Sequence, residues 1–282
     1  MRCLSFQCDA QSVGTVAQRD AHVERLCARL EHEADQCEGV DLVLLPELST
    51  IAYSDANFAR LDALAEGLDG PSVERFAQLA RDLGACVVFG MPRVDTQGRY
   101  YISQVAVDPH GALRGYYDKV HVAQFGASAE KKWFQRGAHS LVFDVAGWRV
   151  GVLICYDMRF AGFASRMVSS HALDVMLHPV AFTQDGSWPS WHAFVQTRAL
   201  ENQVYWLSLN RAGVGWGKSI LCPPWVDDVR QPVVFDEAET CHVYDLSRQA
   251  IDYARSTYPF RGDTLESYDF VERAEPSDTG VS

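Results

Sequence analysis

Short runs of apolar residues recur along this chain, and most are followed at once by a polar residue or a helix breaker. They include "DLVLL" at 41–45, "ACVVFG" at 85–90, "GVLIC" at 151–155 and "LDVMLH" at 173–178. Runs of this length are typical of strands that are buried on both faces of a sheet. A buried strand needs neighbours beside it and layers above and below it, so these runs predict a layered fold with strands at its centre.

Helical patterns lie between these runs. Apolar residues recur at helical spacing over about 18–37, which predicts a helix there. Pro71 suits a first helical turn and Gly84 suits a helix end, so a second helix is expected between them. We expect two further helices, near 160–170 and over about 187–201.

Hairpins interrupt this alternation of strands and helices. Strand-like segments at 99–107 and 112–117 flank the turn signal "DPHG", and a second such pair lies at 140–145 and 148–154. The mixture predicts an α/β fold, a layered sandwich with mixed sheets, and disfavours a purely parallel sheet. Four later strands are expected, at 203–209, 215–221, 231–235 and 240–246.

No internal repeat and no low-complexity linker divides the chain. We therefore expect a single domain over 1–271. Residues 272–282 are acidic and poor in apolar residues, which predicts a frayed tail.

Charge and hydropathy disfavour several classes of partner. The chain carries 25 Lys and Arg against 37 Asp and Glu, a net charge of −12, which disfavours binding to phosphate backbones. The N-terminus lacks the apolar stretch of a secretion signal, and no segment approaches the roughly 20 apolar residues of a membrane span. We therefore expect a cytoplasmic protein that binds neither nucleic acid nor membranes.

Eight cysteines occur without a C-x-x-C pair. Their spacing predicts reduced thiols and no structural zinc. Neither a cluster of metal ligands nor a phosphate-binding glycine loop is visible in the sequence, so we expect no metal and no cofactor.

Three reactive side chains each follow a predicted strand. Glu47 comes just after "DLVLL", Lys119 follows "LRGYYD", and Cys155 ends "GVLIC". Ligands of open α/β sheets bind at the carboxyl ends of the strands, so a carboxylate, an ammonium and a thiol could meet there. Taken singly, a solvated carboxylate, a surface lysine and a core thiol are the commoner interpretations, so spacing alone leaves the function open.

Together the three groups have a clear chemical logic. A free cysteine has a pKa of about 8.5, so attack on a carbonyl or nitrile carbon needs a nearby base, here Glu47, to take the thiol proton. Lys119 and the backbone N–H of Tyr156 would hold the resulting oxyanion. Glu47 could later activate a water molecule.

Three segments in order, "LLPELS", "YYDKVHV" and "GVLICYDMRF", resemble the signature segments of the nitrilase superfamily of carbon–nitrogen hydrolases. The segment "TRALENQVYWLSLNRAG" at 197–213 is similar to a further family helix and strand. The resemblance implies the family's α-β-β-α sandwich, usually joined as a homodimer. It also implies that Glu47 is the general base, Lys119 the oxyanion-stabilising lysine and Cys155 the acyl-accepting nucleophile.

Many family members have a second active-site glutamate about 25 residues before the cysteine, and Glu130 matches that position. The resemblance gives it the role of orienting Lys119 and the substrate amide. The alternative is a solvated loop carboxylate beside Lys131 and Lys132.

The nucleophile segment "CYDMRF" resembles the amidase members of the family, including ω-amidase and related small-amide hydrolases. True nitrilases typically show Cys-Trp-Glu at that place. The resemblance thus implies hydrolysis of a small linear amide to a carboxylate and ammonia through a thioester. The acyl group stays open, as does the choice among amide, nitrile and carbamoyl substrates, or acyl transfer.

Three residues are candidates for binding the substrate. Arg159 could bind a substrate carboxylate, or form a structural ion pair with a neighbouring acid. His178 could line the pocket, or be a hydrogen-bonded histidine at a strand end. Phe182 could shape an apolar pocket, as could Phe125, Trp133 and Trp188, although such aromatic residues most often belong to a core.

Two rival functions keep part of this reasoning. Cys155 could be paired with a histidine, His121 or His178, as in other cysteine hydrolases. In that case a Glu47→Gln substitution would be mild. The chain could also be a non-catalytic homologue that binds a small molecule without converting it.

Overall fold

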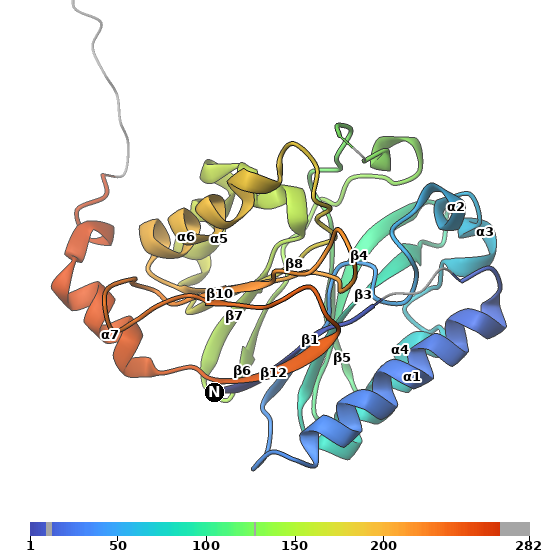
Figure 1. Cartoon of the computed structure of the whole chain (residues 1–282), viewed down its shortest axis with the longest axis horizontal. Helices are drawn as coiled ribbons and strands as arrows, with labels where there is room; N and C mark the ends of the chain where they lie inside the picture. Colours follow the sequence, from blue (N-terminus) through green and yellow to red (C-terminus); the bar gives the residue numbers. More distant parts are fainter. Residues whose placement is uncertain (10–12, 127, 266–282) are drawn as a thin grey trace, which may run out of the picture.

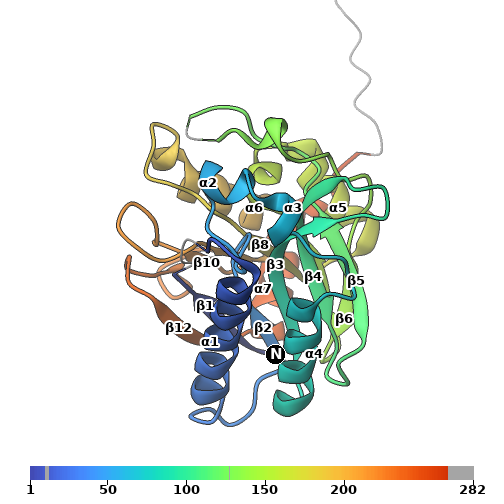
Figure 2. The same cartoon turned by 90° about the vertical axis from the view of Figure 1, so that its right-hand side faces the viewer.

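Two six-stranded sheets pack face to face between two layers of helices in the computed structural model, which describes residues 1–9, 13–126 and 128–265 (Figure 1). Helices α1 (Val16–Ala34) and α4 (Pro71–Leu83) cover the first sheet and lie side by side in front of it in Figure 2. Helices α5 (Ala161–His171) and α6 (Trp191–Asn202) cover the second sheet. The molecule is therefore the expected α-β-β-α sandwich with two mixed sheets.

The two sheets share one pattern of strand directions. From β12 to β5 in the first sheet, and from β6 to β11 in the second, neighbouring strands pair antiparallel, parallel, parallel, antiparallel and antiparallel. The first sheet has the order β12 (Thr240–Asp245), β1 (Arg2–Gln7), β2 (Leu42–Leu44), β3 (Cys86–Val94), β4 (Tyr100–Val107), β5 (Leu113–Asp118). The second has the order β11 (Val233–Val234), β10 (Ile220–Cys222), β9 (Tyr205–Leu209), β8 (Val175–Pro179), β7 (Trp148–Val152), β6 (Val142–Val145).

Side chains of the central strands alternate between two apolar clusters. In β2 and just after it, Val43 and Leu45 pack toward α1 and α4, whereas Leu42 and Leu44 face the second sheet. Successive side chains of a strand point to opposite faces, and here both faces are covered. This is why "DLVLL" reads as a continuous apolar run and not as an alternating one.

The remaining helices are short or peripheral. None of the helices that the structure describes is long and apolar enough to cross a membrane. Single turns and the last helix complete the chain: α2 (Asp55–Phe58), α3 (Leu61–Leu64), η1 (Glu130–Lys132), η2 (Cys155–Arg159), η3 (Trp188–Ser190), α7 (Arg248–Thr257) and η4 (Pro259–Arg261).

Most elements lie where the sequence predicts them, and the departures have local causes. Helix α4 starts at Pro71 and ends before Gly84, whose φ of +62° is the expected left-handed helix end. The strand expected at 215–221 begins only at Ile220, because Gly213, Gly215 and Gly217 all have positive φ and form a turn there. Helices α2 and α3 are single turns, too short to show a period. The predicted domain end at 271 and the tail lie outside the described residues.

Gly90 in β3 lets the loop that carries Glu47 fold back onto the sheet. A Cβ atom at Gly90 would collide with the carbonyl oxygen of Pro46 and approach the amide nitrogen of Leu48 to 2.5 Å. Ser49 then fixes the loop on both sides of Gly90, because its Oγ donates to the Gly90 carbonyl at 3.0 Å and accepts from the Gly90 N–H at 3.1 Å. The close approach of two backbones requires glycine here.

A Gly90→Ala substitution should therefore lower the free energy of unfolding by ~2 kcal/mol, because the added methyl group must push the Glu47 loop away from the sheet. Urea unfolding measures this change. Gly162→Ala is the matched control, since no atom lies within 4 Å of its Cβ position, and it should leave stability unchanged or raise it by ~0.5 kcal/mol. Equal stability of the two variants would contradict the close approach at Gly90.

Candidate active site

Three strands of the two sheets end close together, and each is followed by one of the predicted reactive residues. Strand β5 runs in the same direction as β2, because β4 between β3 and β5 is antiparallel to both. Glu47 follows β2 and Lys119 follows β5, so both leave the first sheet at one edge. Cys155 follows β7 in the second sheet. Glu47 and Lys119 are fully buried, and Cys155 is 9% exposed.

Lys119 lies between two buried carboxylates. Its Nζ donates to Oε1 of Glu47 at 2.8 Å and to Oε1 of Glu130 at 2.7 Å. Glu130 is 1% exposed. The predicted residue set therefore comes together, and the alternative of a solvated loop carboxylate at Glu130 does not hold.

Hydrogen bonds to the remaining carboxylate oxygens fix the two glutamates. Oε2 of Glu47 accepts from the backbone N–H of Ala181, and Oε2 of Glu130 accepts from the N–H of Ala123, both at 2.7 Å. The hydroxyl of Tyr53 also donates to Oε1 of Glu130, at 2.6 Å. Both carboxylates are thus held in place before any substrate arrives.

Burial and charge shift the pKa values of these groups. Burial raises the pKa of Glu47 above its ordinary value, although Lys119 acts against this shift. Burial would lower the pKa of Lys119, but Glu130 and Glu47 outweigh it and hold that pKa well above the ordinary value. Burial and the charge of Glu47 raise the pKa of Cys155 well above that of a free thiol. Cys155 is therefore a neutral thiol at pH 7 and becomes a nucleophile only when a base takes its proton.

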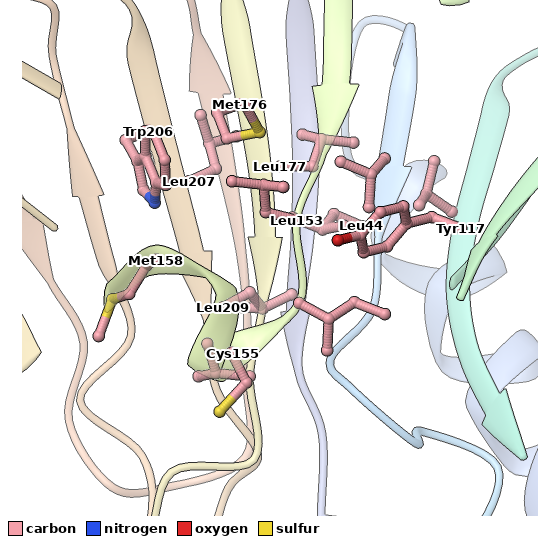
Figure 3. Close-up of a cluster of buried hydrophobic side chains, with 14 of the residues drawn as sticks. Leu44, Tyr117, Leu153, Cys155, Met158, Met176, Leu177, Trp206, Leu207 and Leu209 are labelled. Atoms are coloured by element: carbon pink, nitrogen blue, oxygen red, sulfur yellow. The ribbon is translucent and has the colours of Figure 1, made fainter. Parts of the chain in front are cut away.

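Cys155 begins the turn η2 with a left-handed backbone, at a φ of +45°. Figure 3 shows its sulfur pointing away from the other labelled side chains of the apolar cluster, which include Leu153 and Leu177. A non-glycine residue in this conformation is strained and persists only where its surroundings hold it.

Asp157 holds the nucleophile turn against the segment that carries Lys119. Its fully buried carboxylate accepts from the Tyr117 hydroxyl at 2.7 Å and from the Ile154 N–H at 3.1 Å. The other oxygen binds the backbone N–H and the ring Nδ1 of His121, at 2.9 and 2.7 Å. Tyr117 and His121 flank Lys119 in sequence, so this one carboxylate ties the lysine segment to the cysteine turn.

His178 binds the backbone of Cys155 and is not among the residues that line the pocket. Its Nε2 donates to the Cys155 carbonyl at 2.9 Å, so Nδ1 is the acceptor and takes the hydroxyl proton of Ser208, also at 2.9 Å. Trp191 in turn donates to the Ser208 oxygen at 3.0 Å. Burial lowers the pKa of His178 to about 4, so the ring is neutral at pH 7. These contacts match the strand-end alternative for this histidine.

A pocket of about 30 Å³ opens above Cys155. Phe182, one of the predicted binding residues, lines it together with Tyr156 and Phe125. Arg159 is not among the lining residues that the structure describes; its guanidinium lies over the ring of Phe194 at 5.0 Å and donates to Ser190 at 3.3 Å. No ion pair joins Arg159 to any described acid, so the structural ion pair suggested for it is absent from the described part of the chain.

Sequence reasoning missed several residues that complete this site. Tyr53 contacts Glu130 and Ala181 contacts Glu47, but no motif marks either of them. Asp157, which contacts Tyr117 and His121 on either side of Lys119, appeared only as part of the quoted "CYDMRF". Their partners lie between 36 and 134 residues away in sequence, so no local pattern could indicate the contacts. Within the described residues, no group of three or more His, Cys, Asp or Glu could hold a metal ion.

Comparisons with known proteins show which family the chain belongs to. An ω-amidase of Xenopus tropicalis is 26% identical over 86% of this chain and 89% of its own length. The human ω-amidase is 28% identical over 72% of this chain and 76% of its own. A carbon–nitrogen hydrolase superfamily protein from Xanthomonas campestris superposes with a TM-score of 0.79 at 24% identity, over 96% of this chain and 99% of its own, which shows a shared fold. The sequence profile of the carbon–nitrogen hydrolase family matches residues 8–255, and the chain belongs to that family.

Proposed function

We propose that this protein is an amidase, which hydrolyses a small linear amide to a carboxylate and ammonia through a thioester on Cys155. One arrangement carries this proposal: two buried carboxylates bind Lys119, and the charges of Lys119 and Glu47 act on the pKa of the buried Cys155 thiol. The ω-amidases among its relatives favour an amide substrate over a nitrile. The small volume above Cys155, about 30 Å³, favours a slender acyl group.

In the first half of the reaction, Glu47 takes the Cys155 proton as the sulfur attacks the amide carbon. An S–C bond forms and the carbonyl electrons move onto oxygen, which becomes an oxyanion. When the tetrahedral intermediate collapses, the C–N bond breaks and Glu47 returns the proton to the departing nitrogen, so ammonia leaves. The raised pKa of Glu47 suits both tasks, because a proton taken from the thiol can be held and then given back.

In the second half, water hydrolyses the thioester. Glu47 takes a proton from the attacking water, and the oxygen adds to the thioester carbon. The C–S bond then breaks, the proton returns to the sulfur, and the carboxylic acid leaves. Each proton that Glu47 takes is thus given back within the cycle, and the protein ends in its starting state.

Two groups are suited to donate hydrogen bonds to the oxyanion in both halves of the reaction. Lys119 keeps its positive charge because its pKa lies well above the ordinary value. Tyr156 is the second residue of turn η2, and the first N–H groups of a helical turn have no partner within that turn. Glu130 also binds the Nζ of Lys119 and so helps to hold it in position.

The contacts of the histidines disfavour the rival pairing of Cys155 with a histidine. The Nε2 proton of His178 is used by the carbonyl of Cys155 itself, and the ring is buried and neutral. His121 binds Asp157 through Nδ1 and stacks on Phe160, with 3.7 Å between ring centroids. Glu47, whose charge acts on the buried thiol, is the better candidate for the base.

A Glu47→Gln substitution should lower kcat/KM for a small amide by ~10³-fold, because the amide side chain cannot accept the thiol proton. Ammonia release from a panel of small amides, nitriles and carbamoyl compounds measures this. Intact-mass spectra should show an acyl adduct on the wild-type protein and none on Cys155→Ala.

Cys155→Ala is the control for the chemistry, and His121→Gln tests the rival base. A mild effect of Glu47→Gln together with a severe effect of His121→Gln would overturn the role of Glu47 in favour of the cysteine–histidine pair. Adducts that are released by hydroxylamine but not by water would indicate acyl transfer, and turnover of nitriles alone would make the protein a nitrilase.

We further propose that Asp157 is a positioning residue, since it contacts both the turn of Cys155 and the segment of Lys119. In Asp157→Asn, the side-chain NH₂ group would face N–H and O–H donors that now have no acceptor, which should cost ~3 kcal/mol of stability. Below its unfolding temperature the variant should also lose kcat with little change in KM.

The matched control is Tyr117→Phe, which removes one of the four donors and should cost only ~1 kcal/mol. The rate at which iodoacetamide alkylates the native thiol reports the position of Cys155 independently of turnover. An Asp157→Asn protein that is less stable but has normal kcat and alkylation rate would show that Asp157 acts on stability alone.

A further inference from the structure

The pocket above Cys155 has one charged residue in its described lining, Asp185. Its other lining residues are apolar or carry neutral polar side chains, such as Phe182, Thr183 and Ser187. A charge beside a small, largely apolar pocket is a strong determinant of which ligand enters, because few other polar groups compete with it.

The Asp185 carboxylate is held in place with one oxygen available. Its Oδ1 accepts from the backbone N–H of Ser187 at 2.8 Å and from the Ser187 hydroxyl at 2.6 Å. Its Oδ2 has no hydrogen-bond partner among the described residues. This oxygen lies against Gly126, where any Cβ atom would collide with it. The chain thus presents an oriented acceptor at the pocket wall.

No cation in the described lining balances this charge. Arg159 lies outside the lining and packs over the rings of Phe194 and Phe182, at 5.0 and 5.7 Å. Glu47 and Glu130 are both bound to the Lys119 ammonium, and the whole chain is also acidic, at −12. A substrate carboxylate would meet repulsion here, and a cation would meet attraction.

We propose that Asp185 determines specificity by binding a positively charged group, an ammonium or guanidinium, at the end of the substrate away from the amide. The inference rests on the proposed amidase function and names its substrate class: short cationic amides. Oδ2 accepts a charge-assisted hydrogen bond from the cation, and the Ser187 bonds to Oδ1 keep the acceptor aimed.

Three amides with four-carbon acyl groups test this: butyramide, γ-aminobutyramide and succinamate, which are neutral, cationic and anionic. A second set of three amides, each with one more methylene, tests whether the site prefers a longer substrate. The wild-type protein should show a kcat/KM about tenfold higher for the cationic than for the neutral amide at low ionic strength, with the anionic amide poorest. This preference should shrink as salt is added, because exposed charges are screened.

Asp185→Asn should bring the cationic-to-neutral ratio of kcat/KM close to one, and Asp185→Lys should favour succinamate over γ-aminobutyramide. Asp252→Asn on α7 makes the same change in net charge away from the pocket, and it should leave the wild-type ratios unchanged. A wild-type protein without a preference for the cation would overturn the inference. So would an Asp185→Asn protein in which all three amides lose activity equally, since that result indicates a structural role.

The outcomes separate this inference from the function on which it rests. Hydrolysis of butyramide without regard to charge would overturn the role of Asp185 and leave the amidase proposal standing. Release of no ammonia from any amide, by a folded protein whose Cys155 can be alkylated, would overturn the amidase proposal itself. The wild-type ratio alone decides the first question, so the test does not depend on whether the variants fold.

Discussion

The burial of Lys119 between Glu47 and Glu130 is the constraint on which the rest of the site depends. Removing charges from water costs several kcal/mol per ion, and that cost is offset only when each charge is paired and its remaining lone pairs are hydrogen-bonded. The N–H groups of Ala181 and Ala123 supply those bonds. The result is a buried ammonium of raised pKa beside a buried carboxylate of raised pKa, and the proposed amide hydrolysis uses both.

Neither sheet could build this arrangement alone. The first sheet supplies Glu47 and Lys119 from the ends of β2 and β5, while the second supplies Cys155 after β7 and Ala181 after β8. The two sheets repeat one pattern of strand directions, so each presents the carboxyl ends of three parallel strands. Asp157 and the Glu47–Ala181 bond are polar ties across the two sheets. Packing of the apolar cluster between the sheets therefore sets the distance between Glu47 and Cys155.

Much of this could be predicted from the sequence, because reactive residues that directly follow buried strands are visible as local patterns. Glu47, Lys119 and Cys155 are such residues, and Glu130 came only from the resemblance to a family. What could not be predicted depends on approach in space. Gly90 looks like any other strand glycine in the sequence, and only the structure shows the Pro46 carbonyl against it. Likewise, nothing in the sequence around Asp185 indicates that this residue lines the pocket of Cys155.

The segment from Ala181 to Ser187 contains both the backbone contact to Glu47 and Asp185, so it joins the proposed base to the proposed specificity residue. Its first N–H binds the carboxylate of Glu47, and four residues later Asp185 faces the same pocket. Asn210 fixes the segment between them, because its Oδ1 and Nδ2 bind the N–H and the carbonyl of Phe182, both at 2.9 Å. A change that moves this segment must therefore shift Glu47 as well as Asp185. A new specificity is thus more readily reached by substitutions at the side chain of Asp185 than by insertions into its loop, since only the former leave the bond to Glu47 in place.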